Sequence, residues 1–247
     1  MRLRLLQART SADPVRAEER QQFAARLGIA VEHILPFDLL IGQTTYEQVT
    51  SGVDGVLVGG AGAFSVLDTD PWLRPFMDTM AELADTGFPT FASCFGFQAM
   101  VVALGGEVIH DPDNAEIGSF ILHRADIEDD CPVFGHLPGD FWAQLGHKDR
   151  AAHLPGSARN LVASERCPYQ ALQIDDKPVY ATQFHPELTG AENLGRLDRY
   201  HDEYITAFGA KEVARMREAF IEGPEANALL RRFVEHLERL HITERDF

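Results

Sequence analysis

The residues best suited to chemistry lie in a short segment around Cys94, with the sequence Ala92-Ser-Cys94-Phe-Gly96. A small residue two positions before a nucleophile and a glycine two positions after it are typical of a tight strand-to-helix turn that exposes the nucleophile. The positive end of the following helix dipole favours the thiolate of such a cysteine. The simpler alternative is a buried structural thiol at a strand end. The elbow pattern favours a nucleophile.

A cysteine nucleophile needs an imidazole and a group that orients it. His185 and Glu187 flank Pro186 directly after an apolar run over residues 179–184, and this placement favours a catalytic pair over a structural histidine. Adjacent glycines, Gly59 and Gly60, follow another apolar run. Such a pair permits backbone N–H groups to face a ligand, although a flexible turn is the usual meaning of Gly-Gly.

The elements that must position these residues alternate between apolar strands and amphipathic helices. We expect strands over residues 3–6, 29–35, 55–58 and 89–92, with helices starting near residue 14 and over 71–84 and 95–104. This alternation predicts an α/β fold, doubly wound, with a mostly parallel central sheet and helices on both faces. Ligands then collect at the carboxyl ends of the strands.

The second half of the chain changes character twice. From 107 to 184 short strands are expected at 107–109, 119–122, 171–174 and 179–184, and after residue 186 the pattern is helical over about 194–208, 210–222 and 224–240. We therefore divide the chain into residues 1–189 and a C-terminal helical extension, 190–247, of the same domain.

Composition excludes several function classes. The 247 residues carry 22 Lys+Arg against 38 Asp+Glu, a formal net charge of −16. This charge repels phosphate backbones and anionic lipids, so neither nucleic acid nor a membrane is expected as a partner. The three cysteines, Cys94, Cys131 and Cys167, are odd in number and far apart, which predicts free thiols in the cytoplasm. Metal-binding motifs such as His-Glu-x-x-His are absent, and we expect neither a metal nor a cofactor.

Taken together, the three segments resemble the class I, triad-type glutamine amidotransferases, and most closely their stand-alone GMP-synthetase-like branch. The resemblance covers about residues 50–190 and rests on Gly59-Gly60-Ala61, on the elbow running to Phe97-Gln98, and on Phe184-His185-Pro-Glu187. The family's usual Pro and His are replaced by Ala61 and Phe97.

The resemblance implies a catalytic triad of Cys94, His185 and Glu187 that hydrolyses glutamine through a γ-glutamyl thioester. It implies an oxyanion hole made by the backbone N–H groups of Gly60 and Phe95. The implied substrate-binding residues are Gly59, Gln98, His147 and Lys148.

A separate synthetase that accepts the ammonia is the implied partner. Two alternatives remain open. One is a γ-glutamyl peptidase or hydrolase that uses the same triad, and the other is a non-catalytic binding module.

Overall fold

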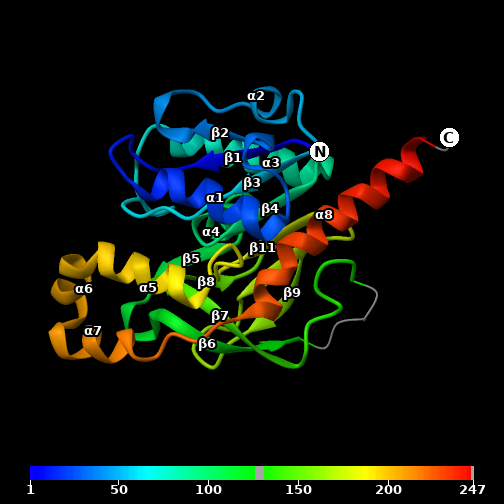
Figure 1. Cartoon of the computed structure of the whole chain (residues 1–247). Helices are drawn as coiled ribbons and strands as arrows, with labels where there is room; N and C mark the ends of the chain where they lie inside the picture. The colour runs from blue at the N-terminus through cyan, green and yellow to red at the C-terminus, as the bar shows by residue number, and fades with distance from the viewer. Residues whose placement is uncertain (126–130, 246–247) are drawn as a thin grey trace.

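The computed structural model describes residues 1–125 and 131–245 and is built on one large mixed β-sheet. The sheet has nine strands in the order β2-β1-β3-β4-β11-β10-β9-β6-β7 (Figure 1). Helices cover both of its faces, so the α/β class predicted from the sequence is confirmed.

The parallel half of the sheet carries the segments with chemistry. Its neighbouring strands pair in parallel throughout: β2 (Ile34–Asp38), β1 (Leu3–Gln7), β3 (Gly55–Val58), β4 (Thr90–Ser93) and β11 (Val179–Thr182). Along the chain, the strands β1 to β4 are connected in turn by the helices α1 (Val15–Leu27), α2 (Tyr46–Thr50) and α3 (Leu73–Thr86). The helix α4 (Phe95–Ala103) follows β4. The carboxyl ends of these strands therefore meet at one edge.

The other half of the sheet is antiparallel. It contains β10 (Ala171–Ile174), β9 (Ala158–Ala163), β6 (Glu116–Arg124) and β7 (Asp140–His147). A separate two-stranded sheet pairs β5 (Glu107–His110) with β8 (Asp149–His153). The long β6–β7 pairing places Glu116 opposite His147.

Two apolar cores lie on the two faces of the sheet. The core beneath α1 and α8 (Pro224–Arg245) includes Phe23, Phe91 and Phe233, all fully buried. The core beneath α3 and α4 includes Phe76 and Phe97, also fully buried. Alternate residues of each central strand supply the two cores, as the two-residue period of a strand requires.

The C-terminal helices begin with a capping box, in which the Thr189 hydroxyl accepts from the Glu192 N–H and the Glu192 carboxylate accepts from the Thr189 N–H. The three helices that follow are α5 (Gly190–Arg199), α6 (His201–Phe208) and α7 (Ala210–Arg217). The single helix predicted over 194–208 is thus wrong, because the backbone leaves helical geometry at Tyr200 (φ −101°, ψ 25°).

The predicted strand 29–35 is also misplaced. Val31–His33 forms a 3₁₀ turn, and the strand starts at Ile34, where pairing with Leu3 of β1 begins. Because β2 lies at the edge of the sheet, it tolerates Pro36, which cannot donate to a neighbouring strand.

Candidate active site

Cys94 occupies a sharp turn between β4 and α4. Its backbone has φ 51° and ψ −102°, a region that non-glycine residues rarely adopt. The turn is held because the Cys94 N–H donates to the Thr182 carbonyl at 2.7 Å and the Gln98 N–H donates to the Cys94 carbonyl at 3.1 Å. The side chain thereby stands at the N-terminus of α4, next to β11.

The elbow leaves no space for a side chain at Gly96. A Cβ there would lie 2.8 Å from Cβ and Cγ1 of Val58 and 3.0 Å from Cβ of Ala92. These neighbours belong to the adjacent buried strands β3 and β4 and cannot move aside freely. The small residues at 92 and 96 are therefore explained by close packing of the helix against the sheet.

We expect Gly96→Ala to destabilise the protein by about 1–3 kcal/mol, the usual range for overpacking a core. It should also lower activity, because the helix that carries Cys94 must shift. Chemical denaturation measures the first effect and an ammonia-release assay the second. Gly139→Ala is the matched control, since a Cβ at Gly139 meets no atom within 4 Å. Equal stability of the two variants would contradict this account of the elbow.

His185 and Glu187 follow β11, the parallel neighbour of β4. The pairing of Thr182 with Ser93 brings the ends of both strands to the same level, so His185 emerges beside Cys94. Its Nδ1 lies 2.7 Å from Oε1 of Glu187, and the ring also hydrogen-bonds the Cys94 side chain. The three side chains that the sequence predicted to act together are thus brought together, and each is at most 8% exposed.

The electrostatics of this group favour a protonated imidazole. Burial alone would lower the pKa of His185, but the charges and hydrogen bonds of Glu187 and Cys94 outweigh it and raise that pKa to about 9. Burial likewise works to raise the pKa of Glu187, yet His185 and then Arg196 bring it below its ordinary value. His185 and Glu187 therefore form a buried ion pair at neutral pH.

Two supporting residues come from the C-terminal helices, and sequence reasoning missed both. Nη1 of Arg196, on α5, lies 3.8 Å from Oε1 of Glu187, while its Nη2 donates to Gln22 at 2.9 Å. The Asn227 amide, on α8, donates to the carbonyls of Pro186 and Leu188 at 2.8 and 2.7 Å. These contacts from α5 and α8 fix the position of the His185–Glu187 segment.

The pair Gly59-Gly60 follows β3, which lies on the opposite side of β4 from β11. A Cβ at Gly60 would lie 2.9 Å from Cε1 of His185 and 3.8 Å from Cβ of Cys94, so this backbone borders the reacting groups directly. Gly59 faces away from them: a Cβ there would meet Oε1 of the buried Glu19 at 2.5 Å.

A cavity of about 550 Å³ opens beside Cys94. That volume lies within the usual range for small-molecule sites, roughly 300–1,000 Å³. Its lining includes Cys94, Phe95, Gly60, Gln98, His147, Lys148 and His185, together with Arg9, Arg196, Tyr200 and Tyr204. The N-terminal, elbow and C-terminal segments therefore share one cavity.

The predicted substrate-binding side chains are partly engaged within the protein. The Gln98 amide donates to the Asp149 carbonyl at 2.7 Å and to Gln183 at 3.2 Å. Nζ of Lys148 lies 5.4 Å from the Phe208 ring centre, in cation–π range. Phe97, the residue that departs from the family motif, is fully buried in the core beneath α4.

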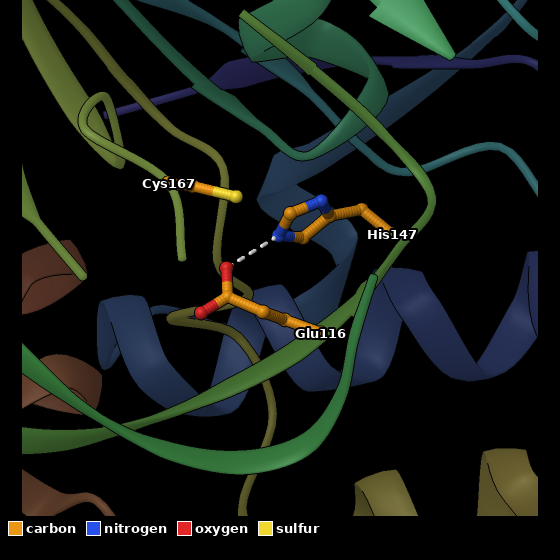
Figure 2. Close-up of side chains that lie close together, drawn as sticks. All are labelled: Glu116, His147 and Cys167. Carbon is orange, nitrogen blue, oxygen red and sulfur yellow. Dashed lines mark hydrogen bonds and ion pairs between the residues drawn. The ribbon is translucent and has the colours of Figure 1, made fainter. Parts of the chain in front are cut away.

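The remaining cysteines are free, as the sequence predicted, and both are buried. Cys167, however, lies beside Glu116 and His147, which are remote from it in sequence (Figure 2). Burial and then the charge of Glu116 raise the pKa of the Cys167 thiol to about 12. Sequence motifs offered no sign of this convergence of three potential metal ligands.

None of the helices within residues 1–125 and 131–245 is long and apolar enough to cross a bilayer.

Residues 26–197 match the family model "Glutamine amidotransferase class-I". A GMP synthase (glutamine-hydrolysing) of Thermosipho africanus is 33% identical over 153 residues, which are 62% of this chain but 28% of that protein. The chain thus matches little more than a quarter of that longer protein.

Shorter relatives are matched over most of their length. A GMP synthase subunit (glutamine-hydrolysing) of Methanocaldococcus jannaschii is 25% identical over 174 residues, covering 69% of this chain and 86% of that protein. The crystal structure of a glutamine amidotransferase from Thermotoga maritima superposes with a TM-score of 0.70 at 19% identity, covering 96% of this chain and 97% of the other.

Proposed function

We propose that this chain, which belongs to the class-I glutamine amidotransferase family, hydrolyses the γ-amide of glutamine to glutamate and ammonia with Cys94, His185 and Glu187 as its triad. The observation that carries the proposal is the continuous contact from Cys94 to His185 to Glu187 at the ends of two adjacent parallel strands, beside a cavity. A binding module would have no need of this buried, charged arrangement.

In the proposed reaction, the Cys94 thiolate attacks the γ-carbonyl carbon of glutamine through its Sγ. The carbon–nitrogen bond breaks as the His185 imidazolium donates its proton to the leaving ammonia, which leaves a γ-glutamyl thioester. Water then attacks the thioester with His185 as general base, and glutamate leaves as Cys94 is regenerated. Glu187 holds the ring through its Nδ1–H and stabilises its positive charge.

The tetrahedral intermediates need hydrogen-bond donors for their oxyanion. We assign this role to the backbone N–H groups of Gly60 and Phe95. Phe95 is the first residue of α4, where the N–H groups have no partner within the helix. Gly60 borders both Cys94 and His185. Both donors would act beside a buried reaction centre, where electrostatic stabilisation is strong.

The amino-acid end of glutamine is assigned to the wall formed by Gln98, His147 and Lys148, which line the same cavity. Because the Gln98 and His147 side chains are engaged with protein groups, we assign the contacts at residues 147–148 to the backbone. Gly59 then serves to place Gly60 and does not touch the substrate.

The two parts of the chain are proposed to act as one domain. Residues 1–189 supply the triad, while the extension over 190–247 braces it through Arg196 and Asn227. Three free cysteines and the net charge of −16 suit a cytoplasmic enzyme.

Ammonia released from such a site needs an acceptor. The matched Methanocaldococcus protein bears the name of a synthase subunit, which favours a separate synthetase as the partner of this chain. The side of the cavity formed by Asn193, Arg196, Tyr200 and Tyr204 lies on α5, on α6 and on the residue between them, so this pair of helices is the proposed docking face.

We expect the isolated chain to release ammonia from glutamine slowly and to be stimulated by its cognate synthetase, since closure by a partner completes such sites. The measurement is ammonia release with and without the synthetase, for glutamine and for γ-glutamyl dipeptides in parallel. A catalytically unrelated ammonia-utilising synthetase serves as the control.

The second candidate, γ-glutamyl peptide hydrolysis, is favoured by the volume of the cavity, which leaves room beyond the γ-amide for a larger leaving group. It predicts faster turnover of γ-glutamyl dipeptides than of glutamine and no stimulation by a synthetase. That result would replace the amidotransferase proposal while retaining the triad.

A further inference from the structure

Glu116, His147 and Cys167 form a second buried cluster close to the catalytic cavity. Glu116 begins β6, His147 ends β7, and Cys167 lies in the segment between β9 and β10. One ligand atom from each, a carboxylate oxygen, an imidazole nitrogen and the sulfur, lies within 4.8 Å of the others, and all three residues are buried. Figure 2 shows the three side chains pointing toward a common centre.

The hydrogen bonds of His147 create an excess of acceptors in this cluster. Its Nδ1 lies 3.1 Å from the Asp149 carbonyl oxygen, which can only accept, so Nδ1 carries a hydrogen. In a neutral ring, Nε2 then presents a lone pair to Oε2 of Glu116 at 3.1 Å. Two acceptors at this distance require a proton or another cation between them.

Other acceptors in the cluster lack donors. Oε1 of Glu116 and Oε1 of Gln170 are buried and accept no hydrogen bond of good geometry from the described residues. The Gln170 amide nitrogen is already committed to Oε2 of Glu116 at 2.5 Å and to the Ser164 hydroxyl at 3.2 Å. The Cys167 thiol lies 3.8 Å from the Asn114 carbonyl oxygen and also hydrogen-bonds the Glu116 side chain, so its sulfur stands directly beside the carboxylate.

We propose that Glu116, His147 and Cys167 bind a divalent transition-metal ion of the Zn²⁺ class. A nitrogen, an oxygen and a sulfur ligand are the set that Zn²⁺ takes in proteins, and Gln170 adds a nearby oxygen donor. The hydrogen bond from Nδ1 of His147 to a backbone carbonyl is the usual outer contact of a metal-bound histidine.

The site has an entry route and a structural consequence. His147 also lines the catalytic cavity, so an ion can reach the cluster from that side. A bound ion would join β6 and β7 to the segment before β10 and so fix the wall that carries Lys148. This inference does not depend on the proposed glutaminase reaction.

The test uses Co²⁺ as a spectroscopic probe of thiolate ligation. Because Cys94 and His185 also offer a thiol and an imidazole, the full chain is studied as the double variant Cys94→Ser, Cys131→Ser, in which Cys167 is the sole thiol. We expect about one Co²⁺ per chain, a thiolate-to-cobalt charge-transfer band, and displacement of the band by Zn²⁺. Adding Glu116→Gln should weaken binding by at least about 10-fold.

The outcomes separate the proposal from an ordinary ion pair. If His147 is simply a protonated partner of Glu116, the double variant shows no charge-transfer band with Co²⁺. Zn²⁺ then also leaves the thermal unfolding midpoint of this variant unchanged. Either result would contradict the proposal. It fails equally if Glu116→Gln leaves the affinity unaltered. Glu238→Gln, at an exposed position on α8, is the matched control and should retain full binding.

Discussion

Replacing Cys94 by alanine is expected to reduce glutamine hydrolysis by about 10³-fold or more, while the protein remains folded. Loss of a nucleophile leaves only binding and oxyanion stabilisation, and in triad enzymes this costs several orders of magnitude. The fold should survive truncation of this 8% exposed side chain, because the backbone conformation of Cys94 is held by hydrogen bonds with Thr182 and Gln98. Ammonia release measures the loss of activity, and the denaturant midpoint measures the stability of the variant.

Covalent labelling provides an independent check on the same nucleophile. A glutamine analogue with an electrophile at the γ position should modify Cys94 alone, since Cys131 and Cys167 are buried and do not line the catalytic cavity. Cys131→Ala is the control and should retain both activity and labelling. Adducts mapped to the other two cysteines, with Cys94 unmodified, would contradict the assignment.

The sequence was sufficient to predict that Cys94, His185 and Glu187 meet, because they lie in local motifs at strand ends. The elbow around Cys94 and the His185-Pro-Glu187 turn each follow an apolar run, and parallel strands bring their carboxyl ends to one edge of a sheet. The pairing of β4 with β11 joins segments about ninety residues apart. Only the general rule for parallel sheets was needed to anticipate this contact.

The antiparallel half was harder to predict. The strands β7, β8 and β9 were missed, because β7 mixes apolar residues with Gln144 and His147, and β8 begins with the adjacent charged residues Asp149 and Arg150. Their pairing depends on neighbours far along the chain. At the break, the Tyr200 hydroxyl contacts Asp13 near the other end of the chain, an interaction that a helical pattern does not contain.

Side chains that act across long sequence separations were also missed. Arg196 and Asn227 contact the triad segment from helices whose patterns show only an amphipathic surface. Glu116, His147 and Cys167 come from three separate segments, and no motif spacing relates them. The expectation that no metal would bind rested on local motifs, which cannot detect such a cluster.

The second large effect is expected for Glu187→Gln, which should lower kcat/KM by about 10²–10⁴-fold and shift its pH dependence. The pKa of His185 is raised to about 9, after the opposing effect of burial, by Glu187 and Cys94. In the wild-type enzyme the imidazolium is therefore present at neutral pH, and activity should fall as pH rises through about 9. Removing the carboxylate takes away a negative charge that stabilises the imidazolium and leaves the nearby Arg196 guanidinium without its counter-charge, so the alkaline limb should move to lower pH.

The same change should alter stability in a defined pH window. A histidine whose pKa is raised in the folded state contributes stability that is complete below its unfolded value of about 6.5 and is lost as pH rises through about 9. Glu187→Gln should remove most of this dependence, while Glu238→Gln, at an exposed position on α8, should retain it. Denaturant unfolding tests the effect on stability, and kcat/KM tests the effect on activity. Both are measured from about pH 6 to about pH 10, so that the range includes the ordinary and the raised pKa of His185. An alkaline limb that stays in place in Glu187→Gln would show that Glu187 does not set the charge of His185, and the triad would reduce to Cys94 and His185.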